Sequence, residues 1–384
     1  MKRVFIKSLI ATVALAAVGV ASAQDKTIKF ANQNTAGHPI VLGMEKFKEI
    51  VEKNSGGKIK VNVFPGGALG SDQANVSAIQ GGTLEMASMN SGIFANQVKE
   101  FAIFDFPFMF ATGKEADAVV DGPFGKKLHA KLEEKGLIGL GYYELGFRNI
   151  TNSKRAINKV EDLEGLKLRV IPNPINVDWV KALGANPTPL PWPEVYSALE
   201  QKAVDGQENP VATINGAKLY EVQKNLVLTG HQYNPQSVII SKKFWEKLSA
   251  AEKKIVADAV TESAKFQREK ARALEASILD NLKKNGMQVT QLPEAEMAKL
   301  RDKMRPVTAK YGVTVGQDLL KELRGALPGT QSVRSTICRS VKYEKPLDPS
   351  RQALVIPLRP LTRPLNDRWE QGEIEFVPVF GFGL

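Results

Sequence analysis

Two arginines and one asparagine stand beside apolar segments, where a side chain can reach a bound molecule. Arg148 directly follows a predicted strand, Arg169 interrupts the apolar alternation of Leu166–Val170, and Asn209 lies in the turn before Pro210. An arginine among strand residues needs an anion, and its planar guanidinium holds a carboxylate by two charge-assisted hydrogen bonds. On the pattern alone, an internal pair with an acidic residue, or a side chain that extends to water, is the favoured explanation for each arginine.

Residue combinations that indicate catalysis are missing from the sequence. His38, His129 and His231 stand in no metal-binding spacing, no GxSxG motif occurs, and Gly66–Gly70 lacks the Gly-Lys-Ser/Thr of a phosphate loop. Cys338 is the only cysteine, so the chain forms no internal disulfide or CxxC pair. The sequence therefore predicts a protein that is not an enzyme and binds no metal or cofactor. An enzyme whose residues meet only in three dimensions is the alternative.

Strands and helices alternate along the chain in two successive sets. The first set spans 27–90 and includes the alternating segment Ile59–Val63 and a helix over 72–80. The second set is predicted to comprise helices at Ile175–Leu183 and Glu194–Gln201 and strands at Leu137–Tyr143, Leu166–Ile171, Leu226–Leu228 and Val238–Ile240. Such alternation is typical of α/β units with a largely parallel sheet.

A long helix is predicted to connect the two sets. Ser249 and Glu252 form a capping box that opens a helix running past Asn281. Two α/β lobes with several crossings describe a hinged clamshell, whose cleft is the natural ligand site. We expect lobe I to comprise 24–145 with about 231–265, and lobe II to comprise 146–230 with about 266–327.

The N-terminus has the pattern of an export signal. Lys2, Arg3 and Lys7 flank an apolar run of about 13 residues, too short to span a bilayer, that ends at the small residues Ala21-Ser22-Ala23. We expect residues 1–23 to be removed and the mature protein to be periplasmic and not membrane-embedded. A retained amphipathic anchor is the alternative, but the run has no polar face.

Length and charge restrict the class of protein further. About 360 residues remain after cleavage, more than one core usually holds, so two lobes are expected. The net charge of +11 forms no basic stripe interleaved with aromatics, which argues against nucleic-acid binding. Residues 328–384 hold seven of the 21 prolines and show no regular period, so we expect this tail to be poorly ordered and assign it no function.

Several ordered motifs resemble those of the DctP-type solute receptors of TRAP transporters. The resemblance extends over roughly Lys26 to Arg324 and excludes the tail. The motifs that carry it are Gly56–Ile59, Pro65–Gly70, Gly146–Asn152, Asp162–Val170, Pro191–Gln201 and Val204–Pro210. The resemblance implies a two-lobed periplasmic-binding-protein fold and a sodium-driven pair of TRAP membrane subunits as partner. The expected assembly state is a monomer.

The same resemblance assigns roles in lobe II. In the family, the arginine of the Leu-Arg-Val strand forms the main salt bridge to a substrate carboxylate, and Arg169 occupies its position. The resemblance implies a supporting role for Arg148, an amide contact from Asn209 and an aromatic wall at Trp192. These four residues are the predicted lobe II part of the ligand site.

Three further residues are expected on lobe I. The resemblance places Asp72 and Asn90 on the cleft face and His38 in a loop that often contacts the rest of the ligand. Helix capping, turn formation and core packing would explain each of these residues equally well, as core packing would explain Trp192. In the expected mechanism, ligand contacts from both lobes shift the population towards the closed form.

The predicted ligand is a small organic acid, and its class follows from the lobe I residues. His38 and Asn90 are neutral where a second carboxylate would require a cation, whereas Asp72 and Asn90 suit hydroxyl groups. This favours a sugar acid such as a uronate or aldonate over a C4-dicarboxylate or a 2-keto acid. The segments Phe147–Asn152 and Tyr233–Gln236 also resemble uronate-binding members. A receptor that serves as a signalling partner is a further alternative.

Overall fold

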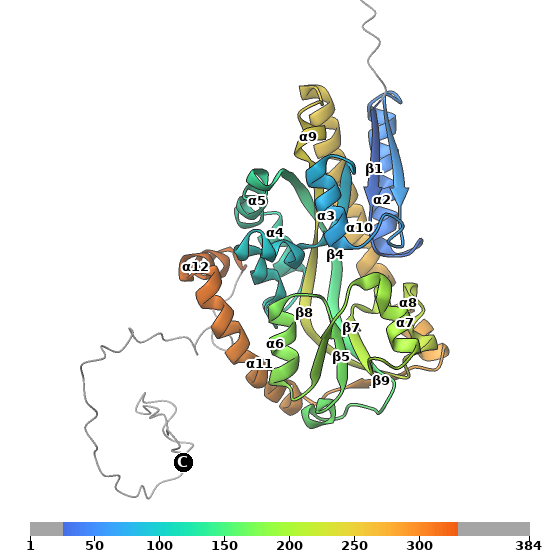
Figure 1. Ribbon diagram of the computed structural model, residues 1–384, viewed down its shortest axis with the longest axis vertical. Coiled ribbons are helices and arrows are strands. Elements are labelled where there is room, and N and C mark those ends of the chain that lie inside the picture. The colour runs from blue at the N-terminus through green and yellow to red at the C-terminus, as the bar shows by residue number, and fades with distance from the viewer. Residues whose placement is uncertain (1–25, 329–384) are drawn as a thin grey trace, which may run out of the picture. The chain divides into compact units, whose positions relative to one another are not determined.

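The computed structural model describes residues 26–328, in which one mixed sheet of nine strands carries the fold (Figure 1). The expected export signal, the tail beyond Pro328 and Cys338 lie outside the described residues. The order of the strands is β2-β1-β3-β8-β4-β7-β5-β6, with β9 paired to β8. The strands are β1 Lys26–Ala31, β2 Ile59–Phe64, β3 Met86–Asn90, β4 Leu137–Asn152, β5 Lys167–Val170, β6 Asn186–Pro189, β7 Gly206–Asn209, β8 Asn225–Ser241 and β9 Gln288–Gln291.

Helices cover both faces of this sheet. The α-helices are α2 Pro39–Asn54, α3 Asp72–Gly81, α4 Gly113–Val120, α5 Pro123–Ala130, α6 Pro174–Ala182, α7 Val195–Glu200, α8 Val211–Gly216, α9 Lys242–Trp245, α10 Ala250–Lys284, α11 Glu294–Val315 and α12 Gln317–Ala326. Short 3₁₀ helices are η1 Ser91–Asn96, η2 Lys99–Asp105, η3 Glu133–Lys135, η4 Val160–Leu163, η5 Trp192–Glu194 and η6 Leu219–Glu221. The helices predicted near 72–80, 175–183 and 194–201 correspond to α3, α6 and α7.

Two long antiparallel strands, β4 and β8, run through both halves of the sheet. Near one end β8 pairs with β3, where Met86 lies opposite Ile240, and at the other end β4 pairs with β7, where Asn149 lies opposite Asn209. The sequence predicted only short strands at 137–143, 226–228 and 238–240. Buried polar residues of β8, among them His231, interrupt the apolar alternation, which is why the pattern did not show one continuous strand.

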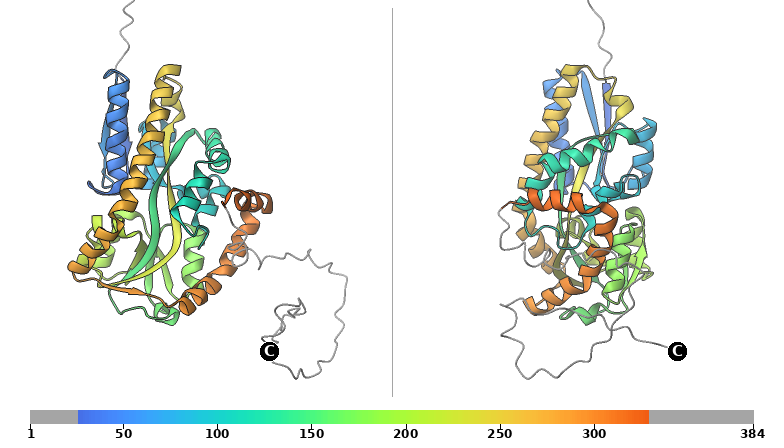
Figure 2. Two further views of the ribbon diagram at one scale, coloured as in Figure 1. Left: turned by 180° about the vertical axis from the view of Figure 1, so that it is seen from behind. Right: turned by 90° about the vertical axis from the view of Figure 1, so that its left-hand side faces the viewer.

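Helix α10 lies beside both halves of the molecule. Its predicted capping box is present: Ser249 Oγ accepts from the Glu252 amide at 3.3 Å, and the Glu252 carboxylate accepts from the Ser249 amide at 2.7 Å. The helix has 35 residues and contacts α2, β4 and α8 along its length (Figure 2). Since β4, β8 and α10 extend along both halves of the sheet, the lobe boundaries given above stay a prediction.

Apolar residues form three buried clusters that hold these layers together. One lies between α2, α10 and strands β1 to β3 and includes Phe30 and Phe47, whose rings meet edge to face at 5.3 Å. Another lies under α7 and α8 and includes Leu226 and Leu282. The largest packs α6, α11 and α12 together with η2. Within 26–328, no helix has the length and apolarity needed to cross a membrane.

Candidate ligand-binding site

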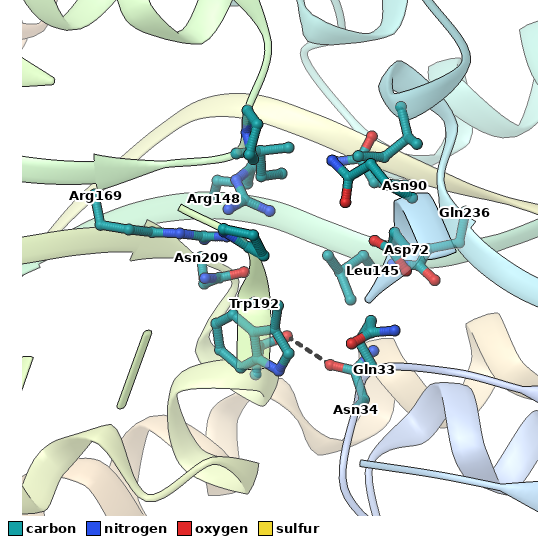
Figure 3. A pocket seen from close by; sticks show the side chains of 16 residues that line it. Gln33, Asn34, Asp72, Asn90, Leu145, Arg148, Arg169, Trp192, Asn209 and Gln236 are labelled. Atoms are coloured by element: carbon teal, nitrogen blue, oxygen red, sulfur yellow. Dashed lines mark hydrogen bonds between the residues drawn. The ribbon is translucent and has the colours of Figure 1, made fainter. Parts of the chain in front are cut away.

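A pocket opens where loops of the two halves face each other across β4 and β8 (Figure 3). Its empty space is about 510 Å³, including the part open to solvent. Six of the seven predicted site residues line it, and these are Asp72, Asn90, Arg148, Arg169, Trp192 and Asn209. These six residues come from distant parts of the chain and meet in one pocket.

Arg169 is a buried cation that has no carboxylate partner among the residues that the structure describes. Its side chain is 2% exposed, and Nε and Nη2 both donate to the carbonyl oxygen of Leu190, at 2.9 and 2.7 Å. Among residues 26–328, no carboxylate lies within ion-pair distance of its guanidinium. Burial lowers the pKa of Arg169 to about 9, which leaves it charged at neutral pH. A buried charge of this kind requires an anion, and Nη1, which has no partner in this part of the chain, can bind one.

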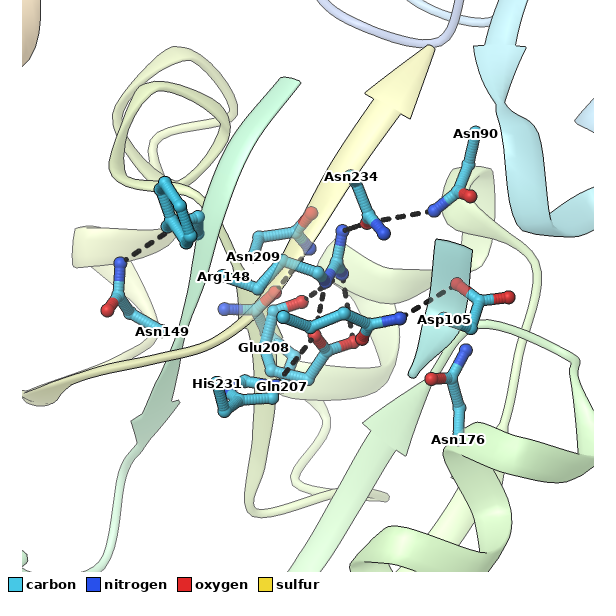
Figure 4. Close-up of polar contacts among 12 residues, drawn as sticks. Asn90, Asp105, Arg148, Asn149, Asn176, Gln207, Glu208, Asn209, His231 and Asn234 are labelled. Atoms are coloured by element: carbon cyan, nitrogen blue, oxygen red, sulfur yellow. Dashed lines mark hydrogen bonds and ion pairs between the residues drawn. The ribbon is translucent and has the colours of Figure 1, made fainter. Parts of the chain in front are cut away.

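Arg148, in contrast, is already paired inside the protein. Nε and Nη2 bind the Glu208 carboxylate, and Nη1 donates to Asn234 Oδ1 at 2.7 Å (Figure 4). Burial alone would raise the pKa of Glu208, but Arg148 and then His231 outweigh it and lower the pKa to about 2. The internal acidic partner favoured by the pattern alone is therefore present for Arg148. One N–H of Nη1 remains for a ligand.

Asn209 and Trp192 complete the side of the pocket on which Arg169 lies. Asn209 ends β7, is 3% exposed and donates from Nδ2 to Gln207 Oε1 at 2.6 Å. Trp192 begins η5, and the centre of its ring lies 5.7 Å from Arg169 Cζ. The guanidinium lies over the face of the ring, an arrangement in which the ring attracts the cation.

The opposite side of the pocket offers hydrogen-bond acceptors. Asp72 begins α3, and its Oδ1 is buried without a hydrogen-bond partner among the described residues, as is Gln33 Oε1. Burial raises the pKa of Asp72 to about 7, against the opposing effects of Arg169 and Gln33. Asn90 caps η1 by accepting from the Gly92 amide at 2.8 Å, and its Nδ2 donates to Asn234 Oδ1 at 2.8 Å. Asp72 and Gln33 are therefore suited to ligand hydroxyl groups.

His38 is the one predicted site residue that lies outside the pocket lining. It caps α2, where Nδ1 accepts from the Ile40 amide at 3.1 Å and Nε2 lies 3.2 Å from Thr213 Oγ1. Burial lowers the pKa of His38 to about 3, so the ring is neutral. The pocket lining includes Thr213, which His38 contacts, and the direct ligand contact expected of His38 stays a prediction.

Ten lining residues were not singled out from the sequence. They are Gln33, Asn34, Gln73, Ile93, Leu145, Ile171, Pro172, Pro191, Thr213 and Gln236. A signal for the first two was present, since the run Asn32-Gln33-Asn34 directly follows an apolar strand. Leu145 and Ile171 are apolar residues whose presence in the pocket no sequence pattern indicates.

This fold, with a pocket between its halves, defines a two-lobed solute-binding protein. The family model described as bacterial extracellular solute-binding protein, family 7, matches residues 30–313. The chain belongs to this family, DctP, as its motifs predicted. Members of the family are solute receptors and not enzymes, and they are periplasmic.

Known proteins similar to this chain bind organic acids. The 2,3-diketo-L-gulonate-binding periplasmic protein YiaO of Escherichia coli (strain K12) is 34% identical over 309 residues, which cover 80% of this chain and 94% of YiaO. The sugar acid binding protein DctPAm of Advenella mimigardefordensis, solved with galactonate, is 40% identical with a TM-score of 0.78, covering 79% of this chain and 98% of that chain. A TRAP solute-binding protein of Ochrobactrum anthropi, with its C-terminus in the ligand pocket, is 51% identical with a TM-score of 0.71, covering 80% and 96%.

Further solved relatives extend the range of ligands. Proteins of Polaromonas sp. JS666 and Sulfurospirillum deleyianum, 36% and 31% identical, were solved with D-erythronate and succinate. These comparisons confirm the predicted two-lobed α/β clamshell and make the chain a TRAP-family receptor for small organic acids.

Proposed function

We propose that the protein binds a hydroxylated monocarboxylate, a sugar acid of the aldonate or uronate class, and delivers it to TRAP membrane subunits in the periplasm. The observation that carries this proposal is the buried guanidinium of Arg169, which faces the pocket without a carboxylate partner in the described chain. A ligand carboxylate supplies the missing charge and accepts from Nη1.

The charges of the pocket favour one carboxylate over two. Of the residues that line it, only Arg148 and Arg169 are cations, and Glu208 already neutralises Arg148. The far side carries Asp72 in place of a third cation. A second ligand carboxylate would therefore lie beside Asp72 and not beside a cation, so its buried charge would have no charged partner on that side of the pocket.

For ligand hydroxyl groups, in contrast, the pocket provides unpaired hydrogen-bond acceptors. Asp72 Oδ1 and Gln33 Oε1 are buried atoms without a hydrogen-bond partner in the described chain. Burying an acceptor without a donor costs free energy, and a hydroxylated ligand would recover it by donating to these atoms. The galactonate bound by the Advenella relative, at 40% identity, is a ligand with this chemistry.

Binding then closes the two lobes. Arg169 on lobe II captures the carboxylate, and Asp72 and Gln33 on lobe I bind hydroxyl groups at the other end of the ligand. Because the ligand contacts both lobes only in the closed form, it shifts the population towards that form. The closed form is the state that the membrane subunits recognise. His38 positions Thr213, which lines the pocket.

A C4-dicarboxylate is the second candidate ligand, favoured by the succinate bound to the Sulfurospirillum relative. Refolded protein, free of carried-over ligand, should be titrated calorimetrically with D-galactonate, D-galacturonate and succinate. A ligand present at a hundredfold excess over its Kd stabilises the folded state by about 2.7 kcal/mol, so a thermal-shift measurement gives an independent reading. Tight binding of a sugar acid and weak binding of succinate is the expected result. The reverse order would assign the protein to dicarboxylates.

A further inference from the structure

Four buried polar side chains form a hydrogen-bonded chain that ends at the pocket. Thr151 Oγ1 donates to Gln223 Oε1 at 2.8 Å, Gln207 Nε2 donates to Thr151 Oγ1 at 2.9 Å, and Asn209 Nδ2 donates to Gln207 Oε1 at 2.6 Å. Thr151, Gln207 and Gln223 are fully buried and do not line the pocket. We call these four residues the amide relay.

The end of the relay that lies far from the pocket is fixed by the backbone. Gln223 Nε2 donates to the carbonyl oxygens of Val222, at 3.0 Å, and Asp205, at 3.3 Å. A carbonyl oxygen only accepts, so the amide nitrogen of Gln223 must face these two atoms. Its Oε1 therefore faces Thr151, and the Thr151 hydroxyl has to donate to it.

The orientation of Gln223 fixes which atom donates and which accepts at each later hydrogen bond of the relay. Since the Thr151 hydroxyl donates to Gln223, its oxygen is free to accept from Gln207 Nε2, and Gln207 Oε1 then accepts from Asn209. The reversed arrangement would make Thr151 donate to Gln207 and leave Gln223 Oε1 without a donor. A buried acceptor without a donor carries its full desolvation cost, so the reversed arrangement is disfavoured.

The relay therefore decides which atom Asn209 offers to the ligand. One of the two N–H groups of its Nδ2 donates to Gln207, and its Oδ1, which accepts no hydrogen bond within 26–328, is the free acceptor at the pocket that Asn209 lines. Arg169 pairs with Gln207 across β5 and β7, so Arg169 and Asn209 project from neighbouring strands on the same face of the sheet. An acceptor thus stands next to the site of the ligand carboxylate.

We propose that the amide relay makes Asn209 accept a hydrogen bond from a ligand hydroxyl on the carbon next to the carboxylate. Thr151, Gln207 and Gln223 then determine specificity by positioning Asn209, without contacting the ligand. This inference rests on the proposed binding of a sugar acid and adds to it a requirement for a 2-hydroxyl group. The alternative is that the relay only fills the sheet interior with satisfied polar groups, in which case it affects stability and not ligand choice.

The test measures selectivity. Wild-type protein and the matched variants Thr151→Val and Thr151→Ser should be titrated with D-galactonate and 2-deoxy-D-galactonate. Wild type is expected to prefer the 2-hydroxy acid by about tenfold, the contribution of one hydrogen bond in a buried site. Thr151→Val, which removes the hydroxyl that fixes Gln207, should reduce this ratio to about threefold or less. Thr151→Ser keeps the hydroxyl and should keep the ratio.

The possible outcomes separate this inference from the proposed function. A folded Thr151→Val protein with the wild-type ratio would overturn the relay. Equal binding of both acids by wild type would also overturn the relay but leave the sugar-acid proposal intact. Binding of neither acid by wild type would overturn the proposed function and the inference with it. If Thr151→Val does not fold, Gln223→Met interrupts the relay at its other end. The ratio of its affinities for D-galactonate and 2-deoxy-D-galactonate then tests the relay, and a wild-type ratio would overturn it.

Discussion

The buried pair of Arg148 and Glu208 gives the most quantitative prediction. Both side chains are 1% exposed, and Glu208 accepts from Arg148 through both carboxylate oxygens. Replacing Glu208 with glutamine keeps the shape of the side chain but leaves the Arg148 charge uncompensated. Removing one partner of a buried pair typically costs about 3–5 kcal/mol.

The pKa of Glu208 gives a second figure for the contribution of the buried pair to the free energy of unfolding. It falls from 4.5 to about 2 on folding, because Arg148 and His231 outweigh the effect of burial. At about 1.4 kcal/mol for each tenfold change, the ionised form contributes about 3 kcal/mol. Since the folded-state pKa is depressed, this contribution is complete above about pH 5 and falls to about half by pH 3. Glu208→Gln should therefore cost about 3 kcal/mol at pH 7 and clearly less at pH 3.

Urea unfolding at 25 °C measures both values. Glu246→Gln is the matched control, since Glu246 is exposed and makes no side-chain hydrogen bond or ion pair within the described residues. The control should unfold within about 0.5 kcal/mol of wild type at either pH. A Glu208→Gln protein as stable as the control, or a cost that is the same at pH 7 and pH 3, would show that the buried pair does not stabilise the fold in this way.

Two further substitutions test how the pocket and α10 are built. In Gly92→Ala, the added Cβ would overlap the Asp105 carboxylate, so overpacking should cost about 1–3 kcal/mol or more in the free energy of unfolding. Ser249→Ala removes the N-cap of α10 and should cost about 1 kcal/mol, while Ser249→Asp, which can cap equally well, should cost little. Urea unfolding measures both, and wild-type stability in either alanine variant would contradict the corresponding contact.

Much of the fold follows from local patterns. Alternating residues such as Ile59 and Val61 indicate β2 correctly, and the capping box at Ser249 and Glu252 indicates the start of α10. The full length of β4 and β8 does not follow, because polar residues such as His231 and Asn234 are buried there. Asn234 accepts from Arg148 and His231 lies 3.5 Å from Glu208, and no local pattern reveals these contacts.

The site, like the fold, has features that the sequence predicts and features that depend on tertiary contacts. Residue type and motif brought Arg169 and Asn209 to one pocket, because both stand at strand ends that meet at one sheet edge. The residue pattern alone did not separate Arg148 from Arg169, although within 26–328 only Arg148 has a carboxylate partner. That difference depends on Glu208, which follows 60 residues after Arg148 and lies beside it only in the folded sheet. Likewise, His38 meets Thr213, which lines the pocket, only through a tertiary contact.

The central claim is that Arg169 binds the ligand carboxylate, and calorimetric titration of Arg169→Ala with D-galactonate tests it most directly. Arg305→Ala is the control for the removal of an arginine outside the pocket, since the Arg305 side chain on α11 is 41% exposed. Leaving the ligand charge without its partner costs about 2–5 kcal/mol, so a loss of about 30-fold or more in affinity is predicted, with wild-type affinity in the control. A folded Arg169→Ala protein that binds D-galactonate within about threefold of wild type would contradict the account.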